Sequence, residues 1–389
     1  MKKQTERSLA HIERVREIRP IEGADNIEQC YVLGWNLIVK KGEFKADDLC
    51  VYVEIDSKVP ERPEFEFLRT KKFAVKTMKL SRFGVYSQGL ALPVSMFKEL
   101  KGKQEGEDVT KLLGITYYKA EDNSRKSNKV DSNASLVIAQ SKHKKFYKNK
   151  LVKRLMRYEW FRKLTIFLFV KKTDKPEGFP TKFKFISKTD ETRIENIPNM
   201  LKDKRPLVCT EKLDGCSATY IMERTSRNKF EFYVCSRNMR IKEGSSTAPS
   251  IYWDMAKKYE IRLALADMLI KEPKLKYACV QGECVGAVQG NPLKLKENDF
   301  YAYNLIFSDT GRIDSVKGRN ILEKYNIKWV PILSTDFVCP DTMEEMKELA
   351  TAKSVVNTSV MREGCVYRSE EDNSISFKNV SREYLLKHE

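Results

Sequence analysis

Glu211-Lys212-Leu213-Asp214-Gly215 lies where a predicted strand, Leu207 to Glu211, runs into a glycine turn. A lysine at such a place is either a solvated turn residue or an amine used in chemistry. The pattern K-x-D-G is weak evidence by itself, because patterns of four residues occur by chance. The motifs further along the chain therefore decide between the two interpretations.

Four further motifs come after Lys212 in order along the chain, and each lies within or at an end of a predicted strand. They are Ser236-Arg237-Asn238, Gly282-Glu283 with Gly286, Arg362-Glu363-Gly364 and Ser376-Phe377-Lys378-Asn379. The chance that this whole ordered series arose by accident is small.

This ordered set resembles the covalent nucleotidyltransferases, which comprise ATP-dependent RNA and DNA ligases and mRNA-capping guanylyltransferases. The resemblance implies that Lys212 is the nucleophile that carries AMP, with Lys378 and Glu363 as further catalytic residues. It also implies a set of residues that bind ATP: Glu211, Glu283, Tyr303, Lys378 and Arg193. Alternatives stay open for two of them: core packing for Tyr303, and for Arg193 a surface salt bridge with Glu191 or Glu195.

The same resemblance implies a divalent cation, Mg²⁺ or Mn²⁺, held by Glu363 with Asp214 and Glu283 acting through waters. Mg²⁺ keeps several waters and needs only a few carboxylates. In many relatives the residue at the place of Glu283 accepts a hydrogen bond from the ribose instead, and this alternative stays open. Arg237 and Asn238 are the implied RNA or phosphate ligands. A planar guanidinium can contact two oxygens of a terminal phosphate at once, whereas an ammonium cannot.

Two positions depart from the pattern of the superfamily. Ser376 stands where the first lysine of a K-x-K pair is common, which weakens contact with the α-phosphate or moves that role to another residue. Asn304 follows Tyr303 where RNA ligases commonly have aspartate, so no role that needs a charge is assigned to it.

The order of domains separates the branches of this superfamily. DNA ligases and capping enzymes place an OB domain after the motif that contains Lys378, whereas only 11 residues follow that lysine here. Residues 11 to about 115 instead show short strands with glycine-marked bends, which is typical of a small barrel. Three stretches resemble an RNA ligase branch with an N-terminal OB domain: Ile21 to Ile27 with Gly34-Trp35, Glu54 to Pro60, and Lys188 to Asn196.

The predicted fold class is α+β. Residues 1–115 are expected to form an OB-type β-barrel, residues 116–178 a basic linker with helical character, and residues 179–389 a nucleotidyltransferase domain of antiparallel sheets flanked by helices. Within the first domain, Gln29 to Lys40 is expected to be one strand with a bend at Gly34.

The last domain is expected to be rich in strands and to contain two helices. Leu207 to Glu211 and Ala218 to Glu223 have the pattern of paired strands. Pro249 to Lys271 has the pattern of one long helix. Asp341-Thr-Met-Glu344 has the spacing of a capping box and predicts the start of the second helix.

The chain carries a formal net charge of +18, and most of it lies in one segment. Residues 118–188 contain 20 Lys and Arg against 6 Asp and Glu, a net charge of +14. The second part of this segment, Ser141 to Lys172, has the composition of a basic amphipathic helix. Contact with a nucleic-acid backbone is one interpretation. The alternatives are a linker helix whose aromatic residues pack on a domain, and contact with an anionic membrane surface.

Composition limits the class of protein. With 41% hydrophobic residues the chain is not mostly disordered, and its central apolar run, Leu164 to Val170, is far too short to span a bilayer. The N-terminal residues lack the apolar stretch of a secretory signal. The nine cysteines form no C-x-x-C pair, which argues against a zinc site and for reduced thiols. We therefore expect a monomer that is intracellular, either cytoplasmic or nuclear, with no membrane partner.

These observations predict an ATP-dependent RNA ligase that joins RNA 3′-hydroxyl and 5′-phosphate ends through lysyl-AMP and adenylylated RNA. A free lysine has a pKa of about 10.4, so the nucleophile needs desolvation or a nearby positive charge to lose its proton. Two alternatives stay open. One is another covalent nucleotidyltransferase, either a DNA ligase or an mRNA-capping guanylyltransferase; the other is a non-catalytic RNA-binding protein.

Overall fold

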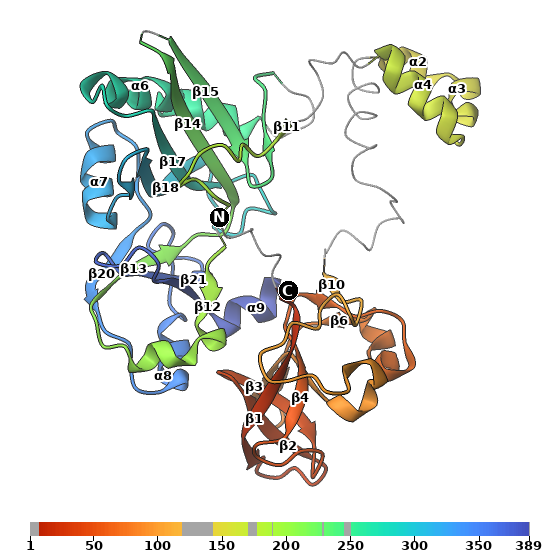
Figure 1. The fold of residues 1–389 in the computed structure, drawn as a ribbon. Helices are drawn as coiled ribbons and strands as arrows, with labels where there is room; N and C mark the ends of the chain where they lie inside the picture. Colours follow the sequence, from red (N-terminus) through yellow and green to blue (C-terminus); the bar gives the residue numbers. More distant parts are fainter. Residues whose placement is uncertain are drawn as a thin grey trace.

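The computed structural model describes residues 8–118, 143–169, 177–188, 190–227, 229–244 and 250–388. Figure 1 shows an N-terminal domain in red and orange and a larger domain in green to blue, with helices on the outer sides of the larger domain's sheets. The last helix, α9 (Arg382–His388), lies between the two domains (Figure 1).

The N-terminal domain is built from short antiparallel strands whose apolar side chains meet in common cores. Its strands are β1 (Ala10–Pro20), β2 (Ile27–Val32), β3 (Trp35–Lys40), β4 (Leu49–Val53), β5 (Ser57–Lys58), β6 (Ala74–Val75), β7 (Thr77–Leu80), β8 (Val85–Gln88), β9 (Leu90–Pro93) and β10 (Thr116–Tyr117). The main sheet has the order β3-β2-β1-β4-β9, and β10-β5-β6 and β7-β8 form two smaller sheets. Three 3₁₀ helices connect them: η1 (Pro63–Lys71), η2 (Val94–Met96) and η3 (Lys98–Leu100).

The expectation of a single strand over Gln29 to Lys40 is wrong. The chain reverses direction between β2 and β3, which pair antiparallel. Leu33, in the turn, takes the left-handed φ of 53°. Gly34 follows because a side chain has no space there: a Cβ would lie 2.6 Å from Met343 Cε and 2.9 Å from the Cα of Glu195. Gly34 is thus a hairpin residue at the contact between the domains, not a bend within a strand.

The larger domain contains two sheets. Its strands are β11 (Glu177–Gly178), β12 (Thr192–Arg193), β13 (Leu207–Lys212), β14 (Cys216–Ser226), β15 (Lys229–Ser236), β16 (Met239–Arg240), β17 (Tyr277–Val285), β18 (Asp299–Phe307), β19 (Gly311–Arg312), β20 (Ile332–Phe337), β21 (Gly364–Arg368) and β22 (Ser376–Val380). The seven-stranded sheet has the order β11-β16-β15-β14-β17-β18-β19, and the five-stranded sheet has the order β12-β22-β21-β13-β20. β12 and β22 pair in parallel, whereas the other pairs in these two sheets are antiparallel.

Helices cover the outer faces of these sheets. They are α5 (Ile251–Lys258), α6 (Ile261–Lys271), α7 (Ser315–Glu323) and α8 (Met343–Leu349). α9 and the 3₁₀ helices η6 (Ile194–Asn196) and η7 (Pro198–Lys202) complete the helices of this domain. α5 and α6 pack on β14, β15 and β17 and enclose the largest apolar core. Within the described residues, no helix combines the length and the apolar character that crossing a membrane requires.

The two strands expected to pair with each other, β13 and β14, lie in different sheets. β13 pairs with β20 and β21, and β14 pairs with β15 and β17. The turn at residues 213–215 therefore carries the chain from one sheet to the other. As a consequence, the K-x-D-G motif lies where the two sheets meet.

Three expectations for the helices need correction. The helix expected over Pro249 to Lys271 is two helices, α5 and α6, because Glu260 takes the left-handed φ of 46° between them; Pro249 itself lies outside the described residues. The capping box is one residue further along than expected, since Thr342 and Glu345 exchange the two hydrogen bonds. The described part of this domain has five α-helices rather than two.

The basic segment Ser141 to Lys172 was expected to form one amphipathic helix. Its described residues form three short helices: α2 (Lys144–Lys148), α3 (Lys150–Leu155) and α4 (Glu159–Phe169). α4 packs against α2 through aromatic rings, with Phe169 edge to face with Phe146 at 5.0 Å. The two ends of the segment, residues 141–142 and 170–172, lie outside the described residues.

The two domains meet through a network of buried hydrogen bonds. Asn196 of η6 accepts a hydrogen bond from Trp35 Nε1 (2.6 Å) and donates one to Glu54 Oε1 (2.6 Å). The backbone N–H of Gly34 donates to the carbonyl oxygen of Glu195 (2.8 Å). All five residues come from the stretches that resembled the RNA ligase branch, so those stretches serve the docking of one domain on the other.

Lys347 of α8 is a buried cation in the same interface. Its side chain is 1% exposed, and its ammonium donates to the carbonyl oxygen of Gly34 (2.6 Å) and to Asn36 Oδ1 (3.1 Å). Burial lowers the pKa of Lys347 to about 8, although Glu195 opposes this shift. A buried ammonium is costly to leave without these acceptors, so Lys347 favours one docked arrangement of the domains.

His11 makes part of the stability of the N-terminal domain depend on pH. Its ring is 8% exposed, with Nδ1 2.7 Å from Glu13 Oε1 and Nε2 3.6 Å from Glu54 Oε1. Burial alone would lower the pKa of His11, but hydrogen bonds and charge from the two carboxylates outweigh it and raise the pKa to about 9. A raised pKa stabilises the fold fully below the unfolded value of about 6.5, and this contribution is lost as pH rises through the folded value.

At roughly pH 6 we therefore expect the wild type to have a higher free energy of unfolding than His11→Gln. This difference should shrink by about 3 kcal/mol as the pH rises to roughly 10. Urea unfolding of both proteins at the two pH values, followed by tryptophan fluorescence, measures the difference. A difference that stays constant over this range would contradict the ion-paired state of His11.

Candidate active site

The ten residues predicted for the site line one cleft of about 1410 Å³. They are Arg193, Glu211, Lys212, Asp214, Arg237, Asn238, Glu283, Tyr303, Glu363 and Lys378. The cleft lies where the two sheets of the larger domain meet, and Asp56 and Tyr117 of the N-terminal domain also line it. The fold thus brings together residues from five separate motifs and places the N-terminal domain beside them.

Lys212 ends β13 and lies opposite Gly364 of β21. This register places Glu363 beside the lysine, with Nζ 2.6 Å from Glu363 Oε1. Burial by itself would lower the pKa of Lys212, but Glu363, Glu283 and Asp214 outweigh it and raise the pKa. The sequence led us to expect surroundings that favour the free amine. In the structure, the ion pair with Glu363 instead holds this side chain as an ammonium.

The turn after Lys212 is shaped by its contact with β17. A Cβ on Gly215 would clash with the backbone of Cys284, so glycine lets the turn approach this strand closely. The approach sets Asp214 near enough to Glu283 for their charges to interact. Asp214 Oδ2 accepts a hydrogen bond from the hydroxyl of Tyr384 on α9. Glycine is therefore required at this position of K-x-D-G for steric reasons, independently of the chemistry of the lysine.

Glu283 lies on β17 opposite Ser217 of β14. Burial raises the pKa of Glu283 to about 8, with Lys212 opposing and Glu363 adding to the shift. An uncharged carboxyl group suits a ribose hydroxyl better than it suits a cation, because it can donate as well as accept a hydrogen bond. This favours the ribose alternative for Glu283 over the metal alternative.

Lys378 and Arg237 meet at a carboxylate that had no assigned role. Asp190 Oδ1 is 3.0 Å from Lys378 Nζ, and Asp190 Oδ2 is 3.0 Å from Arg237. Burial lowers the pKa of Lys378 to about 8; Asp190 opposes this shift, while Arg193 and Lys212 add to it. Two cations that converge on one anionic group form a suitable site for phosphate oxygens.

Tyr303 and Glu211 line the cleft from strands of the two different sheets. Tyr303 of β18 packs against the core and also lines the cleft, with its hydroxyl 3.0 Å from Ser217 Oγ. Glu211 is buried and accepts a hydrogen bond from the backbone N–H of Val355 (2.8 Å). Burial raises the pKa of Glu211. A flat ring and a buried hydrogen-bonding group that line the same cleft can bind a nucleobase.

Arg193 and Asn238 each have a partner that the sequence did not indicate. Arg193 of β12 lies beside Lys378 in register and donates to Asp56 Oδ2 of the N-terminal domain (3.1 Å). Asn238 Oδ1 accepts a hydrogen bond from Lys188 Nζ (2.8 Å). Arg193 therefore links the docked domain to the strand that carries Lys378.

The two departures from the superfamily pattern have separate structural explanations. Ser376 Oγ accepts a hydrogen bond from Arg368 Nε (3.4 Å), and Arg368 forms an ion pair with Glu191 at 2.9 Å. A paired guanidinium thus stands beside the serine that replaces the expected lysine. Asn304 is buried and donates to Gln281 Oε1 (2.9 Å), so it belongs to an internal hydrogen-bond network.

The carboxylates of the cleft fit a hydrated cation better than a directly chelated one. Among the described residues, no group of three or more His, Cys, Asp or Glu side chains is arranged to hold a metal ion directly. Glu363 Oε2 is buried and has no hydrogen-bond partner within the described part of the chain. A cation that keeps its own waters would satisfy this oxygen, and Mg²⁺ is such a cation. Glu363, with Asp214 acting through water, fits the predicted metal site.

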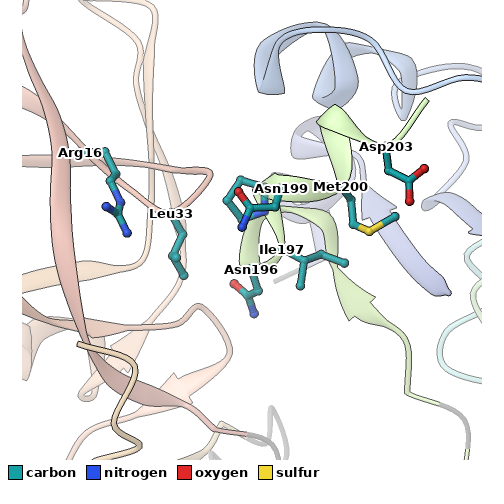
Figure 2. A pocket seen from close by; sticks show the side chains of 8 residues that line it. Arg16, Leu33, Asn196, Ile197, Asn199, Met200 and Asp203 are labelled. Carbon is teal, nitrogen blue, oxygen red and sulfur yellow. The ribbon is translucent and has the colours of Figure 1, made fainter. Parts of the chain in front are cut away.

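A second cavity, of about 800 Å³, lies between the domains away from this cleft (Figure 2). Arg16 and Leu33 line it from the N-terminal domain, and the segment that follows Asn196 lines it from the other domain. Its charged lining residues, Arg16 and Asp203, already form ion pairs within their own domains. None of the predicted residues lines it, so the cleft around Lys212 is the candidate active site.

Comparisons with known proteins agree with this geometry. A family model described as an OB-fold domain matches residues 9–94, and the model of the RNA ligase family matches residues 205–386. A search of curated protein sequences gives no match. Among solved structures, the chain is similar to a Naegleria gruberi RNA ligase mutant with ATP and Mn, with 31% identity and a TM-score of 0.74 over 98% of this chain and 99% of that chain.

The chain belongs to the RNA ligase family. The Naegleria gruberi RNA ligase with PPi, and a mutant of it with AMP and Mn, are each 30% identical to this chain, with TM-scores of 0.74 and the same coverage. The predicted family, the α+β class and the N-terminal OB domain are thereby confirmed.

Motif patterns missed two residues in the cleft of this RNA ligase. Asp190 lies in the stretch Lys188 to Asn196 that resembled the family, so a signal was present but no role was assigned. Tyr384 lies a few residues after Lys378 and belongs to no motif. Only the packing of α9 against the cleft shows its contact with Asp214.

Proposed function

We propose that this ATP-dependent RNA ligase joins an RNA 3′-hydroxyl end to an RNA 5′-phosphate end through lysyl-AMP and an adenylylated RNA end. The observation that carries the proposal is the position of Lys212 in one cleft with Lys378 and Arg237 for phosphate oxygens and Tyr303 for the base. Phosphoryl transfer depends mainly on such positioning and on neutralisation of charge. The relatives solved with ATP, AMP or PPi support ATP as the nucleotide.

In the first step the amine of Lys212 attacks the α-phosphorus of ATP. A P–N bond forms, the bond from that phosphorus to the bridging oxygen breaks, and pyrophosphate leaves with the electron pair. The ammonium must first release one proton to water and leave its contact with Glu363, and the nitrogen releases a second proton to water as the P–N bond forms. Lys378 and Arg237 then exchange Asp190 for phosphate oxygens and stabilise the charge on them.

In the second step an oxygen of the RNA 5′-phosphate attacks the phosphorus of lysyl-AMP. The P–N bond breaks, Lys212 regains its proton, and the RNA carries a 5′-5′ pyrophosphate linkage. In the third step the 3′-hydroxyl oxygen attacks the RNA 5′-phosphorus and loses its proton, while AMP leaves with the electron pair. Arg237 is the proposed ligand of the terminal phosphate, since its planar guanidinium can contact two oxygens at once.

Mg²⁺ or Mn²⁺, held by Glu363 and through water by Asp214, would neutralise phosphate charge and favour loss of the proton from Lys212. The other residues bind and orient the substrates. Their proposed roles are the adenine edge for Glu211, stacking on adenine for Tyr303, the ribose for Glu283, and ATP or RNA phosphates for Arg193 and Asn238.

Sealing assays test the proposed function. We expect joined RNA from strands that carry a 3′-hydroxyl and a 5′-phosphate, with ATP but not with GTP. A strand with a 5′-hydroxyl should not be joined, because it lacks the phosphate that accepts AMP. Matched duplexes in which DNA replaces each strand distinguish this activity from that of a DNA ligase. Joining of DNA nicks alone, or protein labelled by GTP, would contradict the proposal.

Every residue of this scheme lies in one chain and one cleft. We therefore propose that the protein acts as a monomer inside the cell, in the cytoplasm or nucleus, where ATP and RNA ends are both present. Sedimentation of the active protein at assay concentration checks the oligomeric state, and a dimer that carries all the activity would contradict it.

The basic helices α2–α4 are proposed to hold RNA outside the cleft. Residues 143–169 contain nine Lys or Arg and one Glu. Trp160 and Leu168 of α4 are 60% and 61% exposed. Exposed aromatic side chains beside cations suit single-stranded RNA, because bases stack on the rings while the cations contact the backbone.

Replacement of four lysines by glutamine in this segment is expected to weaken RNA binding and to make its salt dependence shallower, by up to about 3 in the slope of log K against log salt. Lysyl-AMP formation should be unchanged, because ATP binds in the cleft. The variant combines changes at Lys142, Lys144, Lys145 and Lys148, of which Lys142 lies outside the described residues.

A matched control removes four exposed lysines from the outer helices of the larger domain, at Lys257, Lys271, Lys317 and Lys324. Titrations of both variants with labelled single-stranded RNA at several salt concentrations give the slopes. A shallower slope only in the first variant supports the proposal. The same slope in the first variant as in the wild type would mean that this segment does not contact RNA.

A further inference from the structure

α9 touches the active site at two points. Its preceding residue, Ser381, donates its backbone N–H to the carbonyl oxygen of Glu363 (2.8 Å), the residue whose carboxylate pairs with Lys212. Within the helix, the hydroxyl of Tyr384 donates a hydrogen bond to Asp214 Oδ2. The residue before α9 therefore contacts the residue paired with the nucleophile, and α9 itself contacts the acidic residue of the K-x-D-G motif.

The same helix is built into the N-terminal domain. Leu385 is 5% exposed and belongs to the core cluster that contains Trp35 and Tyr52. Arg382 Nε donates to Gln88 Oε1 (3.2 Å), and its guanidinium lies over the ring of Tyr86 at 5.3 Å. Because these residues flank Tyr384, a shift of the N-terminal domain would also shift the hydroxyl that contacts Asp214.

We propose that Tyr384 is a positioning residue that orients Asp214 for adenylylation of Lys212, and that α9 makes this orientation depend on the docked N-terminal domain. The inference rests on the proposed function, since it concerns its first step. Tyr384 is 7% exposed and lines the cleft. Packing alone requires only its ring, whereas a buried hydroxyl requires a partner, and the partner here is the acidic residue two positions after the nucleophile.

Tyr384→Phe keeps the ring and removes only the hydrogen bond. We expect the rate of lysyl-AMP formation at saturating ATP to fall about 10-fold, as the loss of a hydrogen bond to a charged group implies. The KM for ATP should stay within about two-fold, because the hydroxyl contacts Asp214 rather than the nucleotide. Lys387→Ala, at an exposed position of the same helix, is the matched control and should react like the wild type.

Two measurements separate positioning from a merely structural role. Tyr384→Phe should stay fully folded at the assay temperature, although loss of the hydrogen bond lowers its melting temperature slightly. Calorimetric binding of ATP to Lys212→Ala, in which no transfer occurs, should not change when Tyr384→Phe is added. Partial unfolding at the assay temperature, or a weaker binding of ATP that accounts for the slower reaction, would overturn the inference.

A double-mutant cycle tests the route through Asp214. If Tyr384 acts on this carboxylate, the effect of Tyr384→Phe should shrink to less than about two-fold in an Asp214→Asn background. If Tyr384→Phe instead slows the reaction as much in the Asp214→Asn background as in the wild type, the inference is overturned. Leu385→Ala, which leaves the hydroxyl in place but weakens its anchorage, should slow the same step; a normal rate in this variant would overturn the dependence on the docked domain.

The outcomes also separate this inference from the proposed function. Absence of lysyl-AMP in the wild type overturns the proposed function, and the inference with it. Lysyl-AMP in the wild type with the same kinetics in Tyr384→Phe overturns the inference alone.

Discussion

Lys212→Ala is expected to abolish the covalent AMP adduct completely, since the other lysines that line the cleft, Lys188 and Lys378, bind Asn238 and Asp190 instead of Glu363. Lys212→Arg should fail equally, because a guanidinium with a pKa above about 12 does not supply a neutral nitrogen. Incubation with α-³²P-labelled ATP and Mg²⁺ or Mn²⁺, followed by a denaturing gel, measures the adduct. Intact mass shows whether purified protein already carries AMP.

The matched control for this experiment is Lys387→Ala, which removes an exposed ammonium and should be labelled like the wild type. Both Lys212 variants should still bind RNA, since α2–α4 are unchanged. Retention of the adduct in Lys212→Ala would contradict the assignment of the nucleophile. Loss of RNA binding together with the adduct would indicate a misfolded protein rather than a missing amine.

Lys378→Ala is expected to slow lysyl-AMP formation by about 10²- to 10³-fold. The side chain is 14% exposed and points its ammonium at Asp190 on the phosphate side of the cleft. Removal of one preorganised donor from such a site typically costs a rate factor of this size. Single-turnover labelling with ATP measures the rate, and Lys378→Arg, which keeps the positive charge, should retain more activity than Lys378→Ala.

The pH dependence of these variants gives a second result. Burial lowers the pKa of Lys378 to about 8, so this residue loses its positive charge as pH rises through that value. The ratio of the wild-type rate to the Lys378→Arg rate should therefore fall above about pH 8, because the arginine keeps its charge while loss of the proton from Lys212 affects both proteins alike. A rate for Lys378→Ala within two-fold of the wild type would contradict the phosphate-binding role.

The resemblance to the covalent nucleotidyltransferases supplied the candidate site residues, and the structure brings them into one cleft. Lys212, Glu283, Glu363 and Lys378 each lie on or beside a strand, and the order of their motifs along the chain carried the resemblance. The short strands and glycine bends before residue 115 predicted a small OB-type barrel; the structure has sheets of five, three and two strands there, in a domain of the OB fold. Strand pattern and turn chemistry are local properties, so a single sequence contains them.

Strand pairing and helix breaks were predicted less well, because they depend on tertiary contacts. β13 and β14 have the pattern of a hairpin, yet they pair with β21 and β17 in different sheets, so the chain crosses between the sheets there. Gly34 resembled a bend within a strand, but it faces Glu195 of the other domain. No local pattern distinguishes these cases.

The direction in which the pKa of Lys212 is shifted could not be predicted from the sequence either. The raised pKa of Lys212 follows from Glu363 at 2.6 Å, a distance set by the register of β13 and β21. Asp190 and Tyr384 contribute through partners that are distant in sequence, Lys378 and Asp214. Such contacts become visible only when the two sheets and α9 are placed together.

Transfer of AMP from the isolated adenylylated protein to RNA tests the ligase mechanism most directly. The protein is labelled with α-³²P-ATP, freed of nucleotide, and mixed with a nicked RNA duplex that carries a 3′-hydroxyl and a 5′-phosphate. The expected result is that label passes from Lys212 to the RNA 5′ end and then to free AMP, with one strand joined for each AMP released and no ATP added. Label that stays on the protein while the RNA remains unjoined would contradict it.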